Sequence, residues 1–395
     1  MDKNNFIQLI VFLHKMFRFD QKKMNSKEAV GAGGFATVYP YGKDKVVKVI
    51  DCKNQEDLFH AMNEAVLGFN LDHPSVLPVE GYYIEKWKDR PHGWTVFLKL
   101  QRMETDLQKV INNANAINKY LKKEDIISYF YDIVSGLEYL NNKKIAHRDL
   151  KPSNLLLDSS GRMKISDIGL ANFVPESSFD NPISRTCGTP KYKAPELQNR
   201  ANHIKKKELF QADIWSLGMI LLELCLLVPT FKPVDPNQTD KEKQDALNDD
   251  LERIDGILDE EEDEEGISKL LRKYLLNIKP SERMSVGEIK GYLEKNYRDI
   301  LVQRCNKKDD FKPQVALSNN NNQFNIIENG QKQFQHEEEK VEIVSSQISR
   351  SETVDTLLSV SKEMQAQWQQ YFTFEKEVQN ELKIKPLLQQ DEGEK

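Results

Sequence analysis

The segment "IAHRDLKPSNLLLDSSGRMKISDIG", residues 145–169, decides the fold of this 395-residue chain. Two short apolar runs, Leu155–Leu157 and Met163–Ile165, flank a polar turn and predict a β-hairpin. An antiparallel hairpin brings its two ends together, so Asn154 at its start and Asp167 just after its end become neighbours. An amide and a carboxylate form an oxygen-donor pair for Mg²⁺, a hard ion that takes phosphate oxygens among its other ligands.

Two further polar residues lie just before the hairpin, at the same end. Asp149 can accept or orient the proton of an attacking hydroxyl group, and Lys151 can neutralise charge on a transferring phosphoryl group. Together with Asn154 and Asp167, these residues predict positioning and electrostatic catalysis of phosphoryl transfer.

Composition argues against several other classes of protein. The formal net charge of −6 argues against a general nucleic-acid binder, so no nucleic-acid partner is expected. The four cysteines show no C-x-x-C spacing. We therefore expect reduced thiols rather than a disulfide framework or a zinc site.

Two apolar stretches, residues 6–13 and 217–228, are too short to span a bilayer, so we expect no transmembrane segment. The first lacks the small-residue cleavage site of a signal peptide and is followed at once by basic residues. A short docked amphipathic helix or an interface is the simpler interpretation of that stretch. The second predicts a buried core helix. Because no targeting signal is recognised, we expect a cytoplasmic or nuclear protein.

The order of strands and helices predicts an α+β fold with two lobes. Residues 26–50 and 94–100 read as strands, and apolar positions at helical spacing lie between them, over 57–71. From residue 127, apolar helical stripes dominate to about residue 297. The predicted divisions are an apolar extension (1–25), a domain (26–297) with a small β-rich lobe (26–103) and a large helical lobe (104–297), an Asn/Gln-rich, mostly disordered linker (298–352) and a helical or coiled-coil tail (353–395).

The tail carries a heptad pattern over residues 357–382, with two polar breaks. This pattern predicts a coiled-coil partner or self-association. A single helix that folds back on the domain is the alternative interpretation.

The glycine-rich stretch "GAGGFA", residues 31–36, fits two templates. The dinucleotide fingerprint needs a helix directly after the glycines, but Pro40 and Gly42 follow, and a helix cannot run through them. The other template is a glycine-rich hairpin that covers nucleotide phosphates and leads into a strand with a lysine, here Lys48. A lysine on the apolar face of a strand needs a carboxylate partner or a phosphate.

Several motifs in order resemble those of eukaryotic protein kinases. "HRDLKPSN" (147–154), "DIG" (167–169) and "APE" (194–196) resemble the catalytic loop, the metal motif and the end of the activation segment. "DIWSLG" (213–218) resembles the start of the central helix of the large lobe. Arg283 resembles the arginine that pairs with Glu196 in the family, and Glu64 resembles the helix-C glutamate that pairs with Lys48. Lys151 and "GTPKY" (188–192) are similar to the serine/threonine type. The resemblance covers about residues 26–297.

The resemblance implies a bilobal protein kinase-like fold and an ATP- and Mg²⁺-dependent serine/threonine kinase that acts on a protein substrate. It implies that Asn154 and Asp167 hold Mg²⁺, while Asp149 and Lys151 act on the substrate hydroxyl and the phosphoryl group. The residues implied to bind the nucleotide are Val30, Gly31, Ala32, Gly33, Gly34, Val38, Val46, Lys48, Glu64, Leu100, Gln101, Met103 and Leu156. A catalytically weak pseudokinase that serves as a scaffold is the alternative.

Regulation is also implied by the resemblance. Arg148, just before Asp149, implies control by phosphorylation of the activation loop. Thr186 is the first candidate for that phosphorylation and Ser184 the second. Thr189 is implied to contact the catalytic aspartate and lysine.

The chain departs from the family pattern at four positions, and none of these changes removes a chemical group of the site. Ala36 replaces a glycine, Val46 an alanine above the adenine, and Ile168 the phenylalanine of the metal motif. Gly68 stands where the family places a bulky apolar residue. We expect a gap there and a loosely held helix over 57–71, steadied by a phosphate, a partner or the N-terminal segment.

Overall fold

The computed structural model describes residues 24, 29–32, 36–87, 93–174, 176–182, 187–198, 204–232, 239–258 and 266–306. Several predictions fall outside these residues. They are the extension apart from Met24, the linker from 307 onward, the tail with its heptad pattern, and the site residues Gly33, Gly34, Ser184 and Thr186.

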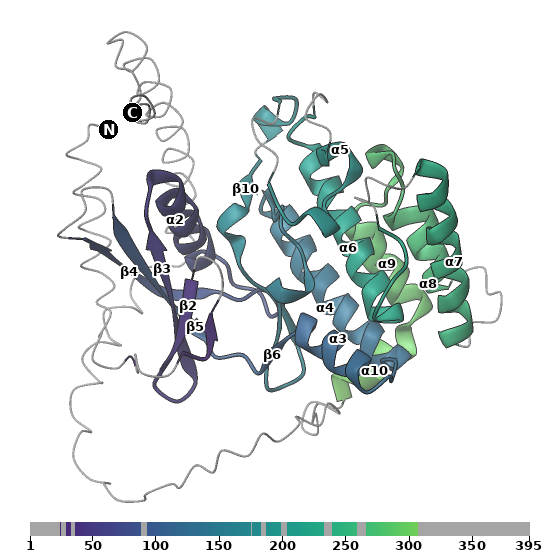
Figure 1. Ribbon diagram of the computed structural model, residues 1–395, viewed down its shortest axis with the longest axis horizontal. Helices are drawn as coiled ribbons and strands as arrows, with labels where there is room; N and C mark the ends of the chain where they lie inside the picture. The colour runs from purple at the N-terminus through teal and green to yellow at the C-terminus, as the bar shows by residue number, and fades with distance from the viewer. Residues whose placement is uncertain are drawn as a thin grey trace, which may run out of the picture. The chain divides into compact units, whose positions relative to one another are not determined.

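The small lobe is a five-stranded antiparallel sheet with the strand order β1-β2-β3-β5-β4 (Figure 1). Its strands are β1 (Gly31–Ala32), β2 (Ala36–Tyr41), β3 (Lys45–Cys52), β4 (Val79–Lys86) and β5 (Trp94–Gln101). Valine, isoleucine and aromatic residues favour these strands because they pack well on a pleated surface. Gly42 adopts the positive φ of 69° that the tight turn between β2 and β3 requires.

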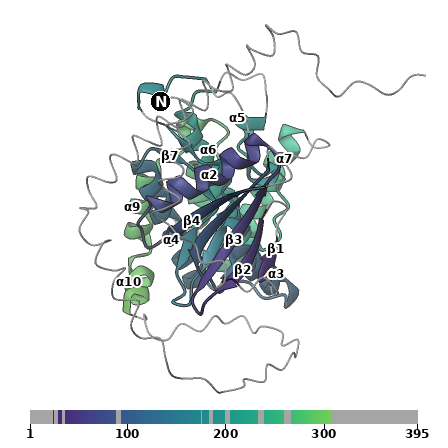
Figure 2. The same ribbon diagram turned by 90° about the vertical axis from the view of Figure 1, so that its left-hand side faces the viewer.

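Helix α2 (Gln55–Phe69) lies against this sheet, as Figure 2 shows. It begins at Asn54, whose side chain accepts a hydrogen bond from the backbone N–H of Asp57. The buried face of α2 includes Ala61, Ala65 and Leu67. The helix therefore packs by the apolar stripe that the sequence predicts.

The large lobe is helical. Its helices are α3 (Leu107–Ala116), α4 (Lys123–Asn142), α5 (Pro195–Gln198), α6 (Glu208–Leu226), α7 (Asp240–Leu258), α8 (Ile267–Lys269), α9 (Val286–Asn296) and α10 (Arg298–Asn306), with a π-helical turn at Leu270–Leu275. Among the described residues, α6 alone is long and apolar enough to cross a membrane, but 89% of that stretch is buried inside the protein. The predicted core helix over 217–228 is thus confirmed for α6, which ends at Leu226.

The predicted hairpin is present. Strands β8 (Leu155–Leu157) and β9 (Met163–Ile165) pair in antiparallel register, and β6 (Thr105–Asp106) extends their sheet. A second small sheet pairs β7 (Ile145–Ala146) with β10 (Asn172–Phe173). The α+β fold with two lobes is confirmed.

The first residues of the predicted linker are helical. At residue 298, where the mostly disordered linker is expected to begin, the chain continues as helix α10, which packs on α4 and α9. Arg304 of α10 forms an ion pair with Asp132 of α4, a carboxylate that is 1% exposed. Asp132 also accepts a hydrogen bond of 2.9 Å from the backbone N–H of Met163. A shift in composition could not show this helix, because a long-range ion pair anchors it.

Candidate active site

Lys48 joins the two lobes. It lies on β3 opposite Val38 of β2, and its Nζ is 2.8 Å from both carboxylate oxygens of Glu64 on α2. The same Nζ lies 3.1 Å from Oδ1 of Asp167, which follows the hairpin of the large lobe. The predicted pairing of Lys48 with a carboxylate is therefore present in the structure.

Electrostatics keep Lys48 and Asp167 of this cluster charged. Burial lowers the pKa of Lys48, but the charges of Glu64 and Asp167 outweigh it and raise that pKa above its ordinary value. Burial also disfavours the charged form of Asp167 and so raises its pKa. The positive charge of the Lys48 ammonium group outweighs this effect and lowers the pKa of Asp167 below its ordinary value. The site therefore holds a lysine cation beside an ionised carboxylate.

Asn63 fastens the metal motif to α2. Its side-chain Nδ2 donates to the carbonyl oxygens of Ala171 at 2.8 Å, Gly169 at 3.2 Å and Ile168 at 3.4 Å, and Asn63 is buried. His60 Nδ1 lies 3.2 Å from the same Gly169 oxygen. These contacts hold the short 3-10 helix η3 (Ile168–Leu170) against the helix that carries Glu64.

Sequence analysis missed this role of Asn63. Its available signal was a polar residue among alanine and methionine on the predicted apolar face of the helix, directly before Glu64. A buried amide at such a position needs hydrogen-bond partners.

The residue just before η3, Asp167, has the left-handed backbone conformation, with φ 60° and ψ 63°. A conformation that is costly for a residue other than glycine persists where the surroundings impose it.

The gap expected at Gly68 is absent. A Cβ atom on Gly68 would lie 2.5 Å from Cγ2 of Val79 and 3.6 Å from Cδ1 of Ile168. The space is therefore filled by Val79 of β4. Glycine at this position allows close approach of α2 to β4, so the expectation of a cavity was wrong.

The catalytic loop is built around Asp149. Its carboxylate accepts hydrogen bonds from Lys151 Nζ at 2.6 Å and from Thr189, whose Oγ1 and backbone N lie at 2.7 and 2.8 Å. Lys151 Nζ also donates to Thr189 Oγ1 at 3.0 Å. Asn154 Nδ2 donates to the backbone oxygen of Asp149 at 2.9 Å. The contact implied for Thr189 is present, and the three predicted residues of the loop, Asp149, Lys151 and Asn154, lie together.

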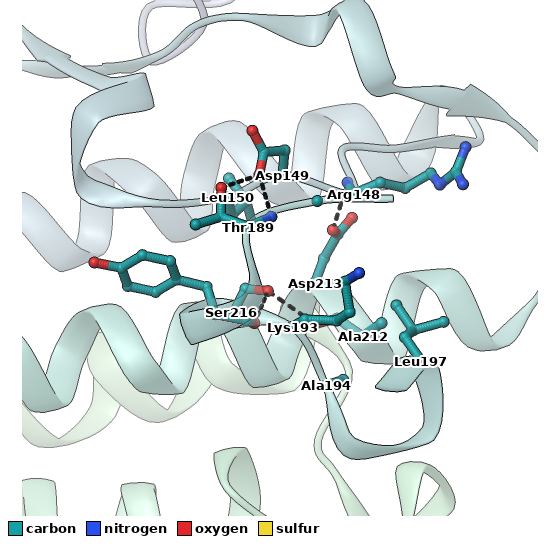
Figure 3. Close-up of a pocket in the computed structure, with 12 residues that line it drawn as sticks. Arg148, Asp149, Leu150, Thr189, Lys193, Ala194, Leu197, Ala212, Asp213 and Ser216 are labelled. Atoms are coloured by element: carbon teal, nitrogen blue, oxygen red, sulfur yellow. Dashed lines mark hydrogen bonds between the residues drawn. The ribbon is translucent and has the colours of Figure 1, made fainter. Parts of the chain in front are cut away.

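Asp213 of α6 holds this loop from below, as Figure 3 shows. It is 1% exposed, and its two oxygens accept hydrogen bonds from the backbone N–H groups of His147 and Arg148 at 2.7 and 2.8 Å. The sequence indicated only that Asp213 begins a motif. Its contact with a loop 65 residues earlier required the tertiary structure.

Asn154 and Asp167 suit a shared Mg²⁺. The hairpin register brings their backbones together, because Ser166 N donates to the oxygen of Asn154 at 2.9 Å. The amide nitrogen of Asn154 is already engaged with Asp149, which leaves its oxygen for a ligand. Within the described part of the chain, no group of three or more His, Cys, Asp or Glu side chains could hold a metal alone. One amide oxygen and one carboxylate therefore fit an ion that also takes phosphate oxygens.

The remaining residues predicted to bind the nucleotide lie in or next to β1, β2, β3, β5 and the large-lobe hairpin. Val46 lies directly opposite Leu100 on the neighbouring strand, and both are buried. Gly31 pairs with Val38, whereas Val30 is 47% exposed. The others take these places: Ala32 in β1, Gln101 at the end of β5, Met103 between β5 and β6, and Leu156 in β8.

The structure describes Arg148, which is predicted to take part in regulation, and the predicted pair of Arg283 and Glu196. Arg148 has a positive φ of 69°, and its Nη1 lies 3.5 Å from the oxygen of Leu170. Arg283 Nη1 and Nη2 bind the two oxygens of Glu196 at 2.7 and 2.9 Å, which confirms the predicted pair. That bidentate pair, in which Arg283 is buried, anchors the end of the activation segment.

Comparison with known proteins agrees with this geometry. The profile of the family described as "Protein kinase domain" matches residues 24–296. Serine/threonine-protein kinase RUNKEL of Arabidopsis thaliana is 32% identical over 206 residues, 52% of this chain and 14% of that protein. CBL-interacting protein kinase 9 of Oryza sativa subsp. japonica is 30% identical over 53% of this chain and 44% of that protein. Serine/threonine-protein kinase SIK1 of Mus musculus is 30% identical over 70% of this chain and 33% of that protein. The chain thus spans less than two thirds of each of these relatives.

Proposed function

Because the chain belongs to the protein kinase domain family, we propose that it is an active serine/threonine kinase that transfers the γ-phosphoryl group of ATP to a protein hydroxyl. The observation that carries this proposal is the Lys48–Glu64–Asp167 cluster, with distances of 2.8 and 3.1 Å. This cluster places the cation of Lys48 beside Asp167, the carboxylate proposed to bind the metal. Such pre-organisation is what electrostatic catalysis requires.

Each residue has a distinct part in the proposed reaction. Lys48, held by Glu64, binds the α- and β-phosphates. Asn154 and Asp167 would hold Mg²⁺, which would neutralise charge on the phosphates. Asp149 orients the acceptor hydroxyl and accepts its proton, and its orientation is set by Thr189 and Lys151.

Lys151 is the positive charge proposed to act on the phosphoryl group in transfer. Its Nζ is 2.6 Å from Asp149 Oδ2, the group that meets the acceptor. The ammonium group can therefore stabilise charge on the transferring phosphoryl group while it keeps Asp149 in place. We further propose that phosphorylation at Thr186 or Ser184 orders the activation segment through Arg148.

A phosphotransfer assay with a generic protein substrate tests the proposal. The wild type is compared with Asp167→Ala and with Asp72→Asn, a change of an exposed acid on the loop after α2. We expect transfer by the wild type and by Asp72→Asn, and loss of at least about 100-fold in Asp167→Ala. Equal phosphoryl transfer by all three proteins would refute the proposed kinase activity of this chain. Nucleotide binding without transfer by the wild type would instead support the pseudokinase scaffold.

The heptad pattern over 357–382 supports a separate proposal, association through a coiled coil. Light scattering of the full chain and of a chain ending at residue 352 tests it. We expect more copies per particle for the full chain than for the shortened one. The same number of copies per particle in both would refute self-association.

A further inference from the structure

Strand β9 leads directly into the carboxylate that is proposed to bind the metal. It ends at Ile165, and Asp167 follows two residues later. In the order β6-β8-β9 the strand lies at the end of its sheet, so it pairs with β8 along one edge. The backbone N–H groups on its other edge need partners from elsewhere in the protein. The groups that hold this outer edge therefore bear on the position of Asp167.

Two different groups hold the outer edge of β9. The N–H of Ile165 donates to the carbonyl oxygen of Ser75 at 2.9 Å, in the loop between α2 and β4 (70–78). The N–H of Met163 donates instead to a side chain, Oδ2 of Asp132 on α4, at 2.9 Å. At Met163 a carboxylate thus takes the place of a neighbouring strand.

The same carboxylate reaches the loop that holds Ile165. Oγ of Ser75 donates to Oδ1 of Asp132 at 3.4 Å. Gly136, one turn further along α4, allows the close approach, because a Cβ atom there would lie 2.5 Å from the oxygen of Ser75 and 3.1 Å from Cδ1 of Ile165. Helix α4, the loop 70–78 and β9 are therefore closely packed at this point.

Two arginines balance the charge of Asp132, one at each oxygen. Arg304 of α10 forms an ion pair with Oδ2, the oxygen that also accepts from Met163. Nη1 of Arg162 lies 3.7 Å from Oδ1. The side chain of Asp132 is 1% exposed, that of Arg304 22% and that of Arg162 36%. Arg304 is thus the more buried partner, and it binds the oxygen that holds β9.

Loss of Arg304 would change which groups Asp132 contacts. A buried carboxylate that loses a cation is strongly destabilised, so it would turn toward Arg162 on its other side. Oδ2 would then leave the N–H of Met163, which would lack its acceptor. Asp167, close after β9, has a left-handed backbone conformation that its surroundings must impose. A loosened β9 would therefore release the carboxylate of Asp167 from its position.

We propose that Arg304 is a positioning residue for the metal site: through Asp132 and the outer edge of β9, it keeps Asp167 where Mg²⁺ can bind beside Asn154. The proposal rests on the kinase function proposed above, because it concerns the Mg²⁺ site of that function. Helix α10 begins at Arg298, after the end of the family match at residue 296, so the family pattern assigns this helix no part in the site.

Hydrogen exchange of the full chain, measured by mass spectrometry without nucleotide or metal, tests the contact with β9. Peptides that cover β9 should exchange about tenfold faster in Arg304→Ala than in the wild type, and more so than peptides of the buried helix α6, which report on opening of the whole lobe. Lys290→Ala is the matched control, because Lys290 on α9 pairs at 2.6 Å with another carboxylate of α4, Glu138. It should leave exchange of β9 unchanged. Unchanged exchange of β9 in Arg304→Ala, or an equal rise in β9 and α6, would overturn the proposal.

The Mg²⁺ concentration for half-maximal phosphoryl transfer tests the effect on the metal site. We expect it to rise about tenfold in Arg304→Ala with KM for the protein substrate unchanged, because groups that orient metal ligands alter metal affinity to this degree. Arg304→Lys keeps the charge and should restore most of the wild-type value. Lys290→Ala should behave like the wild type.

A double-mutant cycle tests the path through Asp132. Asp132→Asn keeps an acceptor for the N–H of Met163 without the charge, so Arg304→Ala should have little further effect on Mg²⁺ dependence in that background. A loss of stability in Arg304→Ala with unchanged Mg²⁺ dependence would show a structural role and overturn the proposal, while the kinase function would stand. Failure of the wild type to transfer phosphate would count against the kinase function and not against the contact with β9, which hydrogen exchange measures.

Discussion

Nζ of Lys48 and Oδ1 of Asp167 lie 3.1 Å apart although 119 residues separate them in the chain. This contact joins the small lobe to the large one at the point where the proposed chemistry occurs. Glu64 completes it from α2, so three separate elements converge on one ammonium group. The predictions below concern the groups that keep this convergence in place.

The charge of Asp167 should stabilise the fold in a defined pH range. Its folded-state pKa lies below the ordinary value of 3.8 because the attraction of Lys48 exceeds the effect of burial. The stabilisation is therefore complete above that ordinary value and is lost as pH falls through the folded-state pKa. Denaturant unfolding of the wild type and of Asp167→Asn, from about pH 6 to about pH 3, measures it. The stability advantage of the wild type should shrink below pH 3.8, and parallel curves would contradict the assignment.

Gly68→Ala should destabilise the small lobe. The added Cβ would lie 2.5 Å from Val79 Cγ2, so a backbone or side chain must shift, at a cost of about 1–3 kcal/mol in unfolding free energy. Gly256→Ala is the matched control, because that glycine also lies in a helix and a Cβ there meets nothing within 4 Å. The control should be neutral or stabilised by up to about 1 kcal/mol.

A second change checks the cause. Val79→Ala removes the atom that meets the new Cβ, so Gly68→Ala should cost less in the Val79→Ala background. Additive effects in this double-mutant cycle would mean that Val79 does not fill the space beside Gly68.

Asn63→Leu should uncouple the metal motif from α2. The change keeps the branched shape and the number of heavy atoms of the side chain but removes the amide that donates to the oxygens of Gly169 and Ala171. We expect unfolding free energy to fall by about 2 kcal/mol, since buried carbonyl groups lose their donor. We also expect kcat to fall, and the Mg²⁺ concentration for half-maximal activity to rise, with little change in KM for peptide.

Asn112→Leu on the exposed face of α3 is the matched control for that experiment. It should alter neither stability nor Mg²⁺ dependence to a comparable degree. A loss of stability in Asn63→Leu with unchanged Mg²⁺ dependence would limit Asn63 to a structural role.

Arg304→Ala should destabilise the large lobe, because it leaves the buried Asp132 without its partner from α10. We expect a loss of about 2 kcal/mol rather than more, since Arg162 Nη1 lies 3.7 Å from the same carboxylate. Chemical denaturation measures it, with Lys295→Ala on the exposed face of α9 as the control. An Arg304→Ala protein as stable as the control would show that the ion pair between Arg304 and Asp132 does not stabilise the domain.

Much of the fold follows from local patterns. The hairpin of β8 and β9 is visible in the sequence because its two apolar runs and its turn lie within eleven residues, Leu155–Ile165. Its ends must meet for the same reason, which brings Asn154 toward Asp167. The need of Lys48 for a carboxylate also follows from its place on an apolar strand face. Glu64 as the partner came from the resemblance to kinases rather than from a local pattern.

Contacts between residues distant in sequence were decided by the tertiary structure alone. Val79 fills the space at Gly68, Asn63 reaches the metal motif 105 residues on, and Arg304 finds Asp132 across 172 residues. The amino-acid order determined which segments become strands and helices, because hydrophobic periodicity acts over a few neighbouring residues. Which side chains meet between those segments depends on close packing of distant surfaces, and no short-range pattern encodes that packing.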